Sequence, residues 1–352
     1  PYTIEYRVPS GEAAGRTRVL KGFWAVTALE EFGTGRIFPH ENTRAAAKTD
    51  RLRLLEACRA NFSPIFCLFS DPSGGILQVL DKAAQAERPR VAFQDDAGYG
   101  HRLWALSDRD LLHDLTEAMQ PKPLFIADGH HRYETALTYR RLRREAEENP
   151  AGWRPYDGVL MLCSSLEDPG LTVLPTHRAL SAPLPPLAQI KAGLQKLGRV
   201  DEFAFQPGTE TKARTTLLRA LRERGREGHA FALAIRQEAV YLLLTLDAAA
   251  APPSTASARD RLDVSLLHGL VMSAAHPAAS EDQPIRHTKD EQEALEWVRR
   301  GEVSAVWILN PTKVSEVRDV AAAGDRMPHK STYFYPKPLT GLVLNVMEPA
   351  AG

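Results

Sequence analysis

The sequence predicts a mixed α/β (α+β) protein built from more than one domain. Its 352 residues correspond to two or three domains at about 150 residues per domain. Segments with helical periodicity alternate along the chain with short apolar segments that are typical of buried strands. A hydrophobic content of 43% and a charged content of 25% are typical of a folded globular protein.

The first third of the chain is predicted to begin with two strands, at residues 2–8 and 16–29, separated by a polar loop. Thr49 or Asp50 can cap the helix that follows, because both residue types accept a hydrogen bond from the first helical turn. Residues 63–69 form an apolar run that ends in a turn rich in proline and glycine, which predicts a buried strand.

The next elements lead to the most informative segment. Residues 108–119 carry leucines on one helical face, and two prolines end that helix before an apolar strand at 124–127. A second helix is predicted over 133–148, followed by a strand at 158–163.

The rest of the chain continues the alternation. Its predicted elements are helices at 187–197 and 210–224 and strands at 202–205, 231–235 and 240–244. The proline-rich residues 181–186 indicate a boundary, and the Ala/Pro/Ser-rich residues 248–258 indicate a surface linker. We therefore expect a phosphate-binding domain at 1–180, an α+β middle region at 181–260 and an α/β C-terminal region at 261–352.

Charge and composition exclude several functions. Lysines and arginines number 44 and acidic residues number 44, which argues against a protein that coats nucleic acid but leaves room for a local basic pocket. No apolar run approaches the roughly 20 residues of a membrane span, and no leader is visible. Cys58, Cys67 and Cys163 are too few and too widely spaced for a disulfide framework. We expect a cytoplasmic protein with small-molecule ligands, no nucleic acid and no membrane.

An apolar strand that runs into Asp128-Gly129-His130-His131-Arg132 and then into a helix is the strongest chemical signal. A helix start carries backbone N–H groups without helical partners and about half a positive charge. Gly129 lets an anion approach the backbone, and Arg132 offers a planar fork that suits phosphate. The segment predicts a phosphate-binding turn. The alternative is a capped helix with two exposed histidines; a zinc site is weaker, since no matching pair follows.

Three other segments carry candidate site residues. In Pro39-His40-Glu41-Asn42-Thr43, Glu41 can act as a general base or a magnesium ligand, or be a solvated carboxylate. Lys330-Ser331-Thr332 looks like the end of a P-loop that lacks the glycine-rich loop, and can hold a phosphate or form a polar strand edge. His177 and Arg178 follow a strand and can line the same pocket, although structural roles are the alternative.

Motifs spread in order from about residue 2 to residue 347 resemble the bacterial DUF1015 family, whose function is unassigned. Members usually carry a further N-terminal stretch that this sequence lacks. The motifs are Pro39-His40-Glu41, Asp50-Arg51-Leu52, Ser63-Pro64-Ile65, Ile126-Ala127-Asp128-Gly129-His130-His131-Arg132-Tyr133-Glu134-Thr135-Ala136, Glu167-Asp168-Pro169-Gly170-Leu171, Leu174-Pro175-Thr176-His177-Arg178, Leu309-Asn310-Pro311-Thr312, and Met327-Pro328 with Lys330-Ser331-Thr332-Tyr333-Phe334 and Pro336-Lys337.

The order of these motifs is also distantly similar to the ParB/sulfiredoxin-like superfamily, whose members bind nucleotide phosphates at the loop that corresponds to Gly129–Arg132. The sulfiredoxin branch needs a cysteine where this chain has His130. Partition proteins carry a DNA-reading helix-turn-helix and a basic surface, which the balanced charge does not favour. Free serine kinases use the Asp-Gly-His-His-Arg motif and a glutamate base, with counterparts here in Asp128–Arg132 and Glu41.

The resemblance implies a nucleotide-dependent phosphotransferase acting on a small hydroxyl metabolite, with free L-serine as the first guess. The nucleotide would be ADP or ATP with Mg²⁺. The implied roles are catalysis by Glu41 and His130, phosphate binding by Asp128, Gly129, His130, His131, Arg132, Lys330, Ser331 and Thr332, magnesium ligation by Glu41 and Asp128, and a pocket completed by His40, Thr43, His177 and Arg178. Two alternatives stay open: a phosphatase acting on a phosphorylated amino acid, and a nucleotide- or metabolite-binding regulator without turnover.

Overall fold

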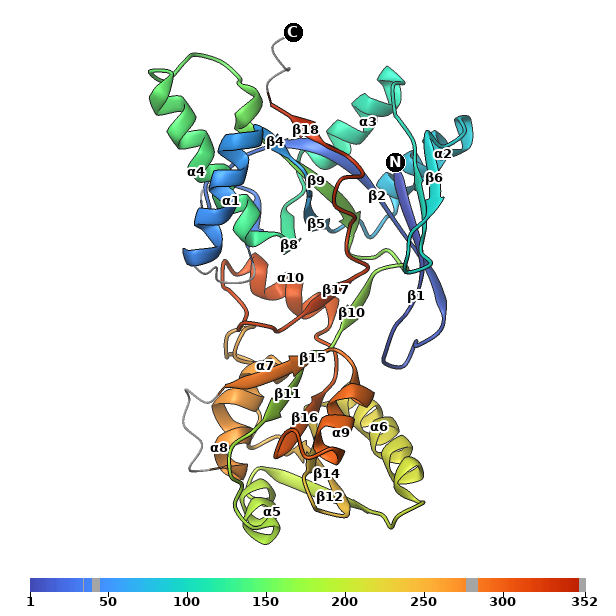
Figure 1. The fold of residues 1–352 in the computed structure, drawn as a ribbon, viewed down its shortest axis with the longest axis vertical. Helices are drawn as coiled ribbons and strands as arrows, with labels where there is room; N and C mark the ends of the chain where they lie inside the picture. The colour runs from blue at the N-terminus through green and yellow to red at the C-terminus, as the bar shows by residue number, and fades with distance from the viewer. Residues whose placement is uncertain (34, 40–44, 277–283, 348–352) are drawn as a thin grey trace.

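Two large β-sheets organise the computed structural model, which describes residues 1–33, 35–39, 45–276 and 284–347, with only the backbone described for 45–48. Figure 1 shows them at opposite ends of the long axis. We call the eight-stranded sheet with helices α1–α4 the first lobe, and the six-stranded sheet with α5–α9 the second lobe. The predicted mixed α/β class is confirmed, whereas a ParB/sulfiredoxin-like architecture stays a prediction.

The first lobe is a mixed sheet covered on both faces. Its strands run in the order β3 (Ile37–Pro39), β8 (Leu124–Asp128), β5 (Ile65–Phe69), β9 (Gly158–Ser165), β2 (Thr17–Ala28), β1 (Tyr2–Arg7), β7 (Gly100–Leu103) and β6 (Val91–Gln94). Its helices are α1 (Ala45–Cys58), α2 (Gly75–Ala86), α3 (Arg109–Met119) and α4 (His130–Ala146). All five residues of β5 are buried, which explains the continuous apolar run at this position.

Alternate residues of β5 enter two different cores. Ile65 and Phe69 pack with side chains of α2, α3 and α4 on one face of the sheet. Phe66 and Leu68 pack on the other face, in a core that includes residues of α10 (Val314–Ala322) and β17 (Tyr333–Tyr335). The C-terminal part of the chain therefore closes the first lobe. Near its C-terminal end the chain also pairs with the first lobe, through the short strands β18 (Asn345–Val346) and β4 (Ala60–Asn61). Figure 1 shows this pair as a red strand beside a blue one.

The second lobe takes its strands from two separate parts of the sequence. Their order is β12 (Gly198–Ala204), β14 (Val240–Leu246), β13 (Ala230–Ile235), β16 (Ala305–Leu309), β11 (His177–Leu180) and β15 (Ile285–Thr288). The helices are α5 (Leu187–Gln195), α6 (Glu210–Glu227), α7 (Asp263–Leu266), α8 (Met272–Ala275) and α9 (Glu291–Arg299). The expected division at residue 260 therefore separates strands that share one sheet. The two-stranded pairing of β10 (Thr172–Leu174) with β17 lies between the lobes.

Several predicted boundaries differ from the structure. Helix α1 begins at Ala45, not after Thr49 or Asp50, since a run of alanines favours helix and extends it toward the N-terminus. Helix α4 begins at His130, three residues before the predicted start. Helix α2 was not predicted, because Gly74 and Gly75 indicate a turn. No helix in the described ranges is both long and apolar enough to cross a membrane.

Candidate functional site: a cationic cavity between the lobes

The turn between β8 and α4 depends on Gly129. Its φ of 97° lies in the left-handed region that side chains disfavour, and α4 starts at the next residue. A Cβ atom at this position would lie 2.8 Å from a guanidinium nitrogen of Arg132. Glycine therefore lets the guanidinium fold back over the turn, beside the N-terminal end of the helix.

This helix end opens into a cavity of about 670 Å³ between the two lobes. Most of the lining comes from three stretches of chain: residues 127–132, residues 287–289 at the end of β15, and the segment that leads into β17. The full lining is Arg51, Ala127, Asp128, Gly129, His130, His131, Arg132, Thr176, His287, Thr288, Lys289, His329, Lys330, Thr332, Tyr333 and Lys337. The structure therefore brings the Asp128–Arg132 turn together with Lys330 and Thr332, which lie about 200 residues later in the sequence.

The cavity lining is strongly cationic. It carries the five basic side chains Arg51, Arg132, Lys289, Lys330 and Lys337, against the single carboxylate of Asp128 among the described residues. The chain as a whole has no formal net charge, so this imbalance is a local property. Burial lowers the pKa of His287 to about 4, reinforced by the charges of Arg178 and Lys330, so this histidine is neutral at pH 7. His287 therefore adds no positive charge to the cavity at pH 7.

Asp128 is held between two of these cations. One carboxylate oxygen accepts a hydrogen bond from Arg132 at 2.6 Å, and the other accepts one from Lys337 at 2.7 Å. Since both oxygens already bind cations, the residue does not fit the magnesium role that the sequence suggested. Within the described ranges, no group of three or more His, Cys, Asp or Glu side chains is placed to hold a metal ion.

Tyr333 positions two lysines in the cavity. The ammonium group of Lys289 lies 4.3 Å from the centre of its ring, and that of Lys337 lies 4.7 Å away. Cation–π attraction stabilises both placements. The ring therefore keeps Lys289, which follows β15, and Lys337, which follows β17, close to the same cavity, although their charges repel.

His177 and Arg178 lie on opposite sides of the second lobe's sheet, which corrects the prediction that they line one pocket. They are neighbours on β11, and successive strand residues point to opposite faces. His177 lines a different cavity, of about 450 Å³, and its Nδ1 accepts from the Leu309 amide at 3.2 Å. Arg178 is fully buried and donates to the carbonyl of Lys330 at 2.9 Å, beneath the cationic cavity.

Within the Lys330-Ser331-Thr332 motif, only the outer two residues line the cavity. Ser331 is 1% exposed, and its hydroxyl donates to the Pro328 carbonyl at 2.5 Å. The phosphate-binding role expected for this serine is therefore not supported, because its side chain is used to close the turn.

The predicted residues His40, Glu41 and Thr43 lie outside the described residues. The described strand β3 runs parallel to β8, with Pro39 opposite Ile126. The two strands therefore end at the same edge of the sheet, at which the Asp128–Arg132 turn also lies.

Sequence reasoning missed several residues of the cavity, namely Arg51, Thr176, His287, Thr288, Lys289, His329, Tyr333 and Lys337. Tyr333 and Lys337 lie in a motif that the sequence singled out, so that their proximity to Lys330 was an available signal. The sequence of strand β15 carried no signal of a site, because only the topology of the second lobe brings the end of this strand to the cavity.

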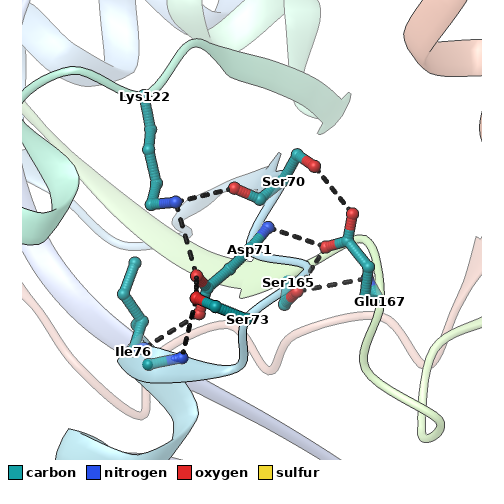
Figure 2. A network of polar contacts seen from close by, with 8 residues as sticks. Ser70, Asp71, Ser73, Ile76, Lys122, Ser165 and Glu167 are labelled. Carbon is teal, nitrogen blue, oxygen red and sulfur yellow. Dashed lines mark hydrogen bonds and ion pairs between the residues drawn. The ribbon is translucent and has the colours of Figure 1, made fainter.

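A second polar cluster lies at the ends of β5 and β9, and Figure 2 shows that its members bind one another. Asp71 accepts from the Ile76 amide at the start of α2 at 2.8 Å and is approached by Lys122 at 3.4 Å. Glu167 accepts from the hydroxyls of Ser70 and Ser165 and from the Asp71 amide. These contacts fix the loop before α2, so we assign the cluster a structural role.

Comparison with solved structures finds distant likenesses that span most of the chain. A free serine kinase in complex with AMP is 13% identical, with 94% of this chain and 90% of that chain covered and a TM-score of 0.38. A conserved hypothetical protein from Pyrococcus furiosus is 12% identical, with 91% and 93% covered and a TM-score of 0.38. SbnI with a C-terminal truncation, from Staphylococcus aureus, is 10% identical, with 93% and 88% covered and a TM-score of 0.43.

A search of the curated proteins gave no match. The family model described as "Protein of unknown function (DUF1015)" matches residues 2–265, which is most of the chain. The protein therefore belongs to the DUF1015 family.

Proposed function

We propose that this protein is a nucleotide-dependent phosphotransferase that acts on a small hydroxyl metabolite, with free L-serine as the first acceptor to test. The observation that carries the proposal is the concentration of five basic side chains around the N-terminal end of α4. A helix N-terminus combined with lysine and arginine is a general solution for binding phosphate.

The size of the cavity agrees with a nucleotide. Its volume of about 670 Å³ lies within the range of roughly 300–1,000 Å³ that is usual for small-molecule sites. Together with the sequence resemblance to free serine kinases, this size favours a phosphate chain that is part of a larger ligand.

Each described residue has a role that its position supports. The first-turn amides of α4, with Gly129 and His131, would bind the phosphates, and Arg132 would place its planar guanidinium against them. Lys330 and Lys337 would neutralise the negative charge of the phosphates, including that of the phosphoryl group being transferred. Phosphoryl transfer depends mainly on such positioning and charge stabilisation, since the protein itself forms few covalent bonds.

Glu41 remains our candidate for the base that accepts the acceptor's hydroxyl proton. It follows Pro39 by two residues, and Pro39 is paired with Ile126, which precedes Asp128 by two residues. This register supports the assignment. His130 is the second catalytic candidate; it is 6% exposed and lines the cavity at the first position of α4.

One observation favours a second candidate, a nucleotide-binding regulator without turnover. Among the described residues, the sole carboxylate in the cavity is that of Asp128, and Arg132 and Lys337 already bind both of its oxygens. A site with this composition holds an anion well, but its described residues offer no carboxylate that is free to act as a base. Catalysis by a carboxylate base therefore depends on Glu41, whereas binding does not.

Phosphorus NMR of the protein with magnesium and ADP or ATP, with and without L-serine, tests the proposal. We expect a new phosphomonoester resonance only when serine is present. Glu41→Gln should abolish this signal and keep nucleotide affinity, while Glu117→Gln, a matched change on the exposed surface of α3, should keep both. Nucleotide binding without any product would favour the regulator instead. Nucleotide breakdown that is the same with and without serine would point to a phosphatase-like activity or another acceptor.

A further inference from the structure

Arg178 is a buried cation held by neutral acceptors. Its side chain is among the largest that are fully buried, at 0% exposure. It donates to the carbonyl oxygens of Thr176 and Lys330, and to Nε2 of His268 at 3.2 Å. His268 accepts through Nε2 and must therefore be neutral, in agreement with burial and the charge of Arg178, which lower its pKa to about 4.

This arrangement is unusual for a buried charge, which is normally paired with an opposite charge. Among the described residues, no carboxylate forms an ion pair with Arg178, and its three hydrogen bonds go to two carbonyls and an imidazole. Burial lowers the pKa of its guanidinium to about 10, which still leaves it protonated at pH 7. The described protein alone therefore does not neutralise this charge.

The position of Arg178 links it to the cationic cavity. Thr176 and Lys330, the two residues whose carbonyls it binds, both line that cavity. Lys330 has a φ of 62°, in the left-handed region that a residue with a side chain adopts only when its surroundings require it. The planar guanidinium fork can hold both carbonyls at once, and so fixes the backbone of Lys330 from beneath.

We propose that Arg178 is a positioning residue for anion binding: it holds Lys330 in its left-handed conformation, and the anion bound in the cavity supplies the negative charge that Arg178 lacks. This inference rests on the proposed function and deepens it. It implies a ligand with several negative charges, such as the diphosphate of a nucleoside diphosphate, because the buried charge adds to the five basic side chains around the cavity. Such a ligand should bind more tightly than singly phosphorylated compounds.

Calorimetric titration of the full chain with pyrophosphate tests the proposal. We expect Arg178→Met to weaken the affinity about tenfold, in the range for loss of one charge-assisted interaction, and Lys330→Met to weaken it similarly. Because Arg178 acts through Lys330, the fold-loss of pyrophosphate affinity in the double variant should be clearly smaller than the product of the fold-losses in the two single variants. Arg286→Met serves as the control, since Arg286 lies on β15 of the same sheet but pairs with Glu302.

The outcomes separate this inference from the proposed function. A wild-type protein that binds neither pyrophosphate nor ADP would overturn both. Wild-type affinity in a folded Arg178→Met variant, or multiplicative losses in the double variant, would overturn the positioning role and leave the proposed function standing. If Arg178→Met does not fold, Arg178→Lys replaces it, because lysine keeps the charge but not the planar fork. Its affinity should fall several-fold, and unchanged affinity would contradict the proposal.

Discussion

Gly129 shows how one residue determines the geometry of the candidate site. Its left-handed φ of 97° turns the chain from β8 directly into α4, so His130 and His131 occupy the first helical turn. The same lack of a side chain leaves space for the Arg132 guanidinium. Backbone direction and cation placement at the cavity therefore depend on one glycine.

Gly129→Ala should lower the free energy of unfolding by about 1–2 kcal/mol, the cost of placing an L side chain in the left-handed region. It should also weaken phosphate binding, because the new methyl group displaces Arg132. Gly152→Ala is the matched control: its φ is 79°, but no atom lies within 4 Å of the added Cβ. Urea unfolding and pyrophosphate titration measure both effects. Equal pyrophosphate affinity in the two variants would show that the cavity does not depend on the Arg132 placement.

Lys337→Met should weaken pyrophosphate binding about tenfold, the loss typical of one charge-assisted hydrogen bond. Lys337 lines the cavity and is held there by Asp128 at 2.7 Å and by the ring of Tyr333. Lys82→Met removes an exposed lysine of α2 and should leave the affinity unchanged. Calorimetric titration measures the pyrophosphate affinity of both variants. An equal loss of affinity in the two would point to long-range electrostatics instead of a local contact.

At the level of elements, the loop before α2 is stabilised by the polar cluster of Figure 2. Gly74 precedes α2 and gives it no side-chain cap, and Asp71 accepts from the Ile76 amide in the first turn instead. Glu167, in the turn after β9, binds the Asp71 amide, so the cluster joins the ends of the parallel strands β5 and β9.

Asp71→Ala should therefore destabilise the protein by about 2 kcal/mol, since it removes a helix cap and leaves Lys122 without its carboxylate. Pyrophosphate affinity should remain that of the wild type, because neither residue lines the cationic cavity. Urea unfolding and calorimetry test the two halves of this expectation. Loss of affinity in the folded variant would show that this loop is coupled to the site.

Asp157, which binds Arg144 of α4, should make the stability of the protein depend on acidic pH. Burial raises the pKa of its carboxyl, but hydrogen bonds from Arg144 at 2.8 and 2.6 Å and from the Arg154 amide outweigh burial and leave the pKa below its ordinary value. The resulting stabilisation is present above the unfolded pKa of about 3.9 and is lost as pH falls through the folded pKa.

Asp157→Asn should accordingly be less stable than the wild type at pH 7, and the difference should shrink below about pH 4. The exposed Asp114→Asn on α3 should show no such pH dependence. Unfolding by urea at several pH values measures this. A difference that stays constant down to pH 2 would show that the Asp157 contacts act through packing and not through charge.

The elements that sequence could predict are those with local signals. The apolar runs of β5, β8 and β9 and the periodic leucines of α3 identify these elements directly. Helix α2 was missed because its glycines indicate a turn, although Ile76, Leu80 and Ala83 have helical spacing. The start of α4 was placed late, because two histidines and an arginine carry no apolar signal.

At the scale of the whole molecule, the site is built by the return of the chain to its first lobe. After β16 the chain passes through α10, which packs in the core of the first lobe. Residues 329–337 then meet the Asp128–Arg132 turn, and Lys289, which follows β15, reaches the cavity from the second lobe. The local turn could be predicted from sequence, because strand, glycine and helix are adjacent. The convergence with Lys330 could only be hypothesised, since about 200 residues separate the two segments.

The crystal structure of the protein with ADP is the most direct test of the central claim. We predict that the diphosphate lies at the N-terminal end of α4, within hydrogen-bonding distance of Arg132 and Lys330. ADP bound elsewhere, for example in the cavity lined by His177, would contradict the account, and so would a cationic cavity that stays without nucleotide when ADP is saturating.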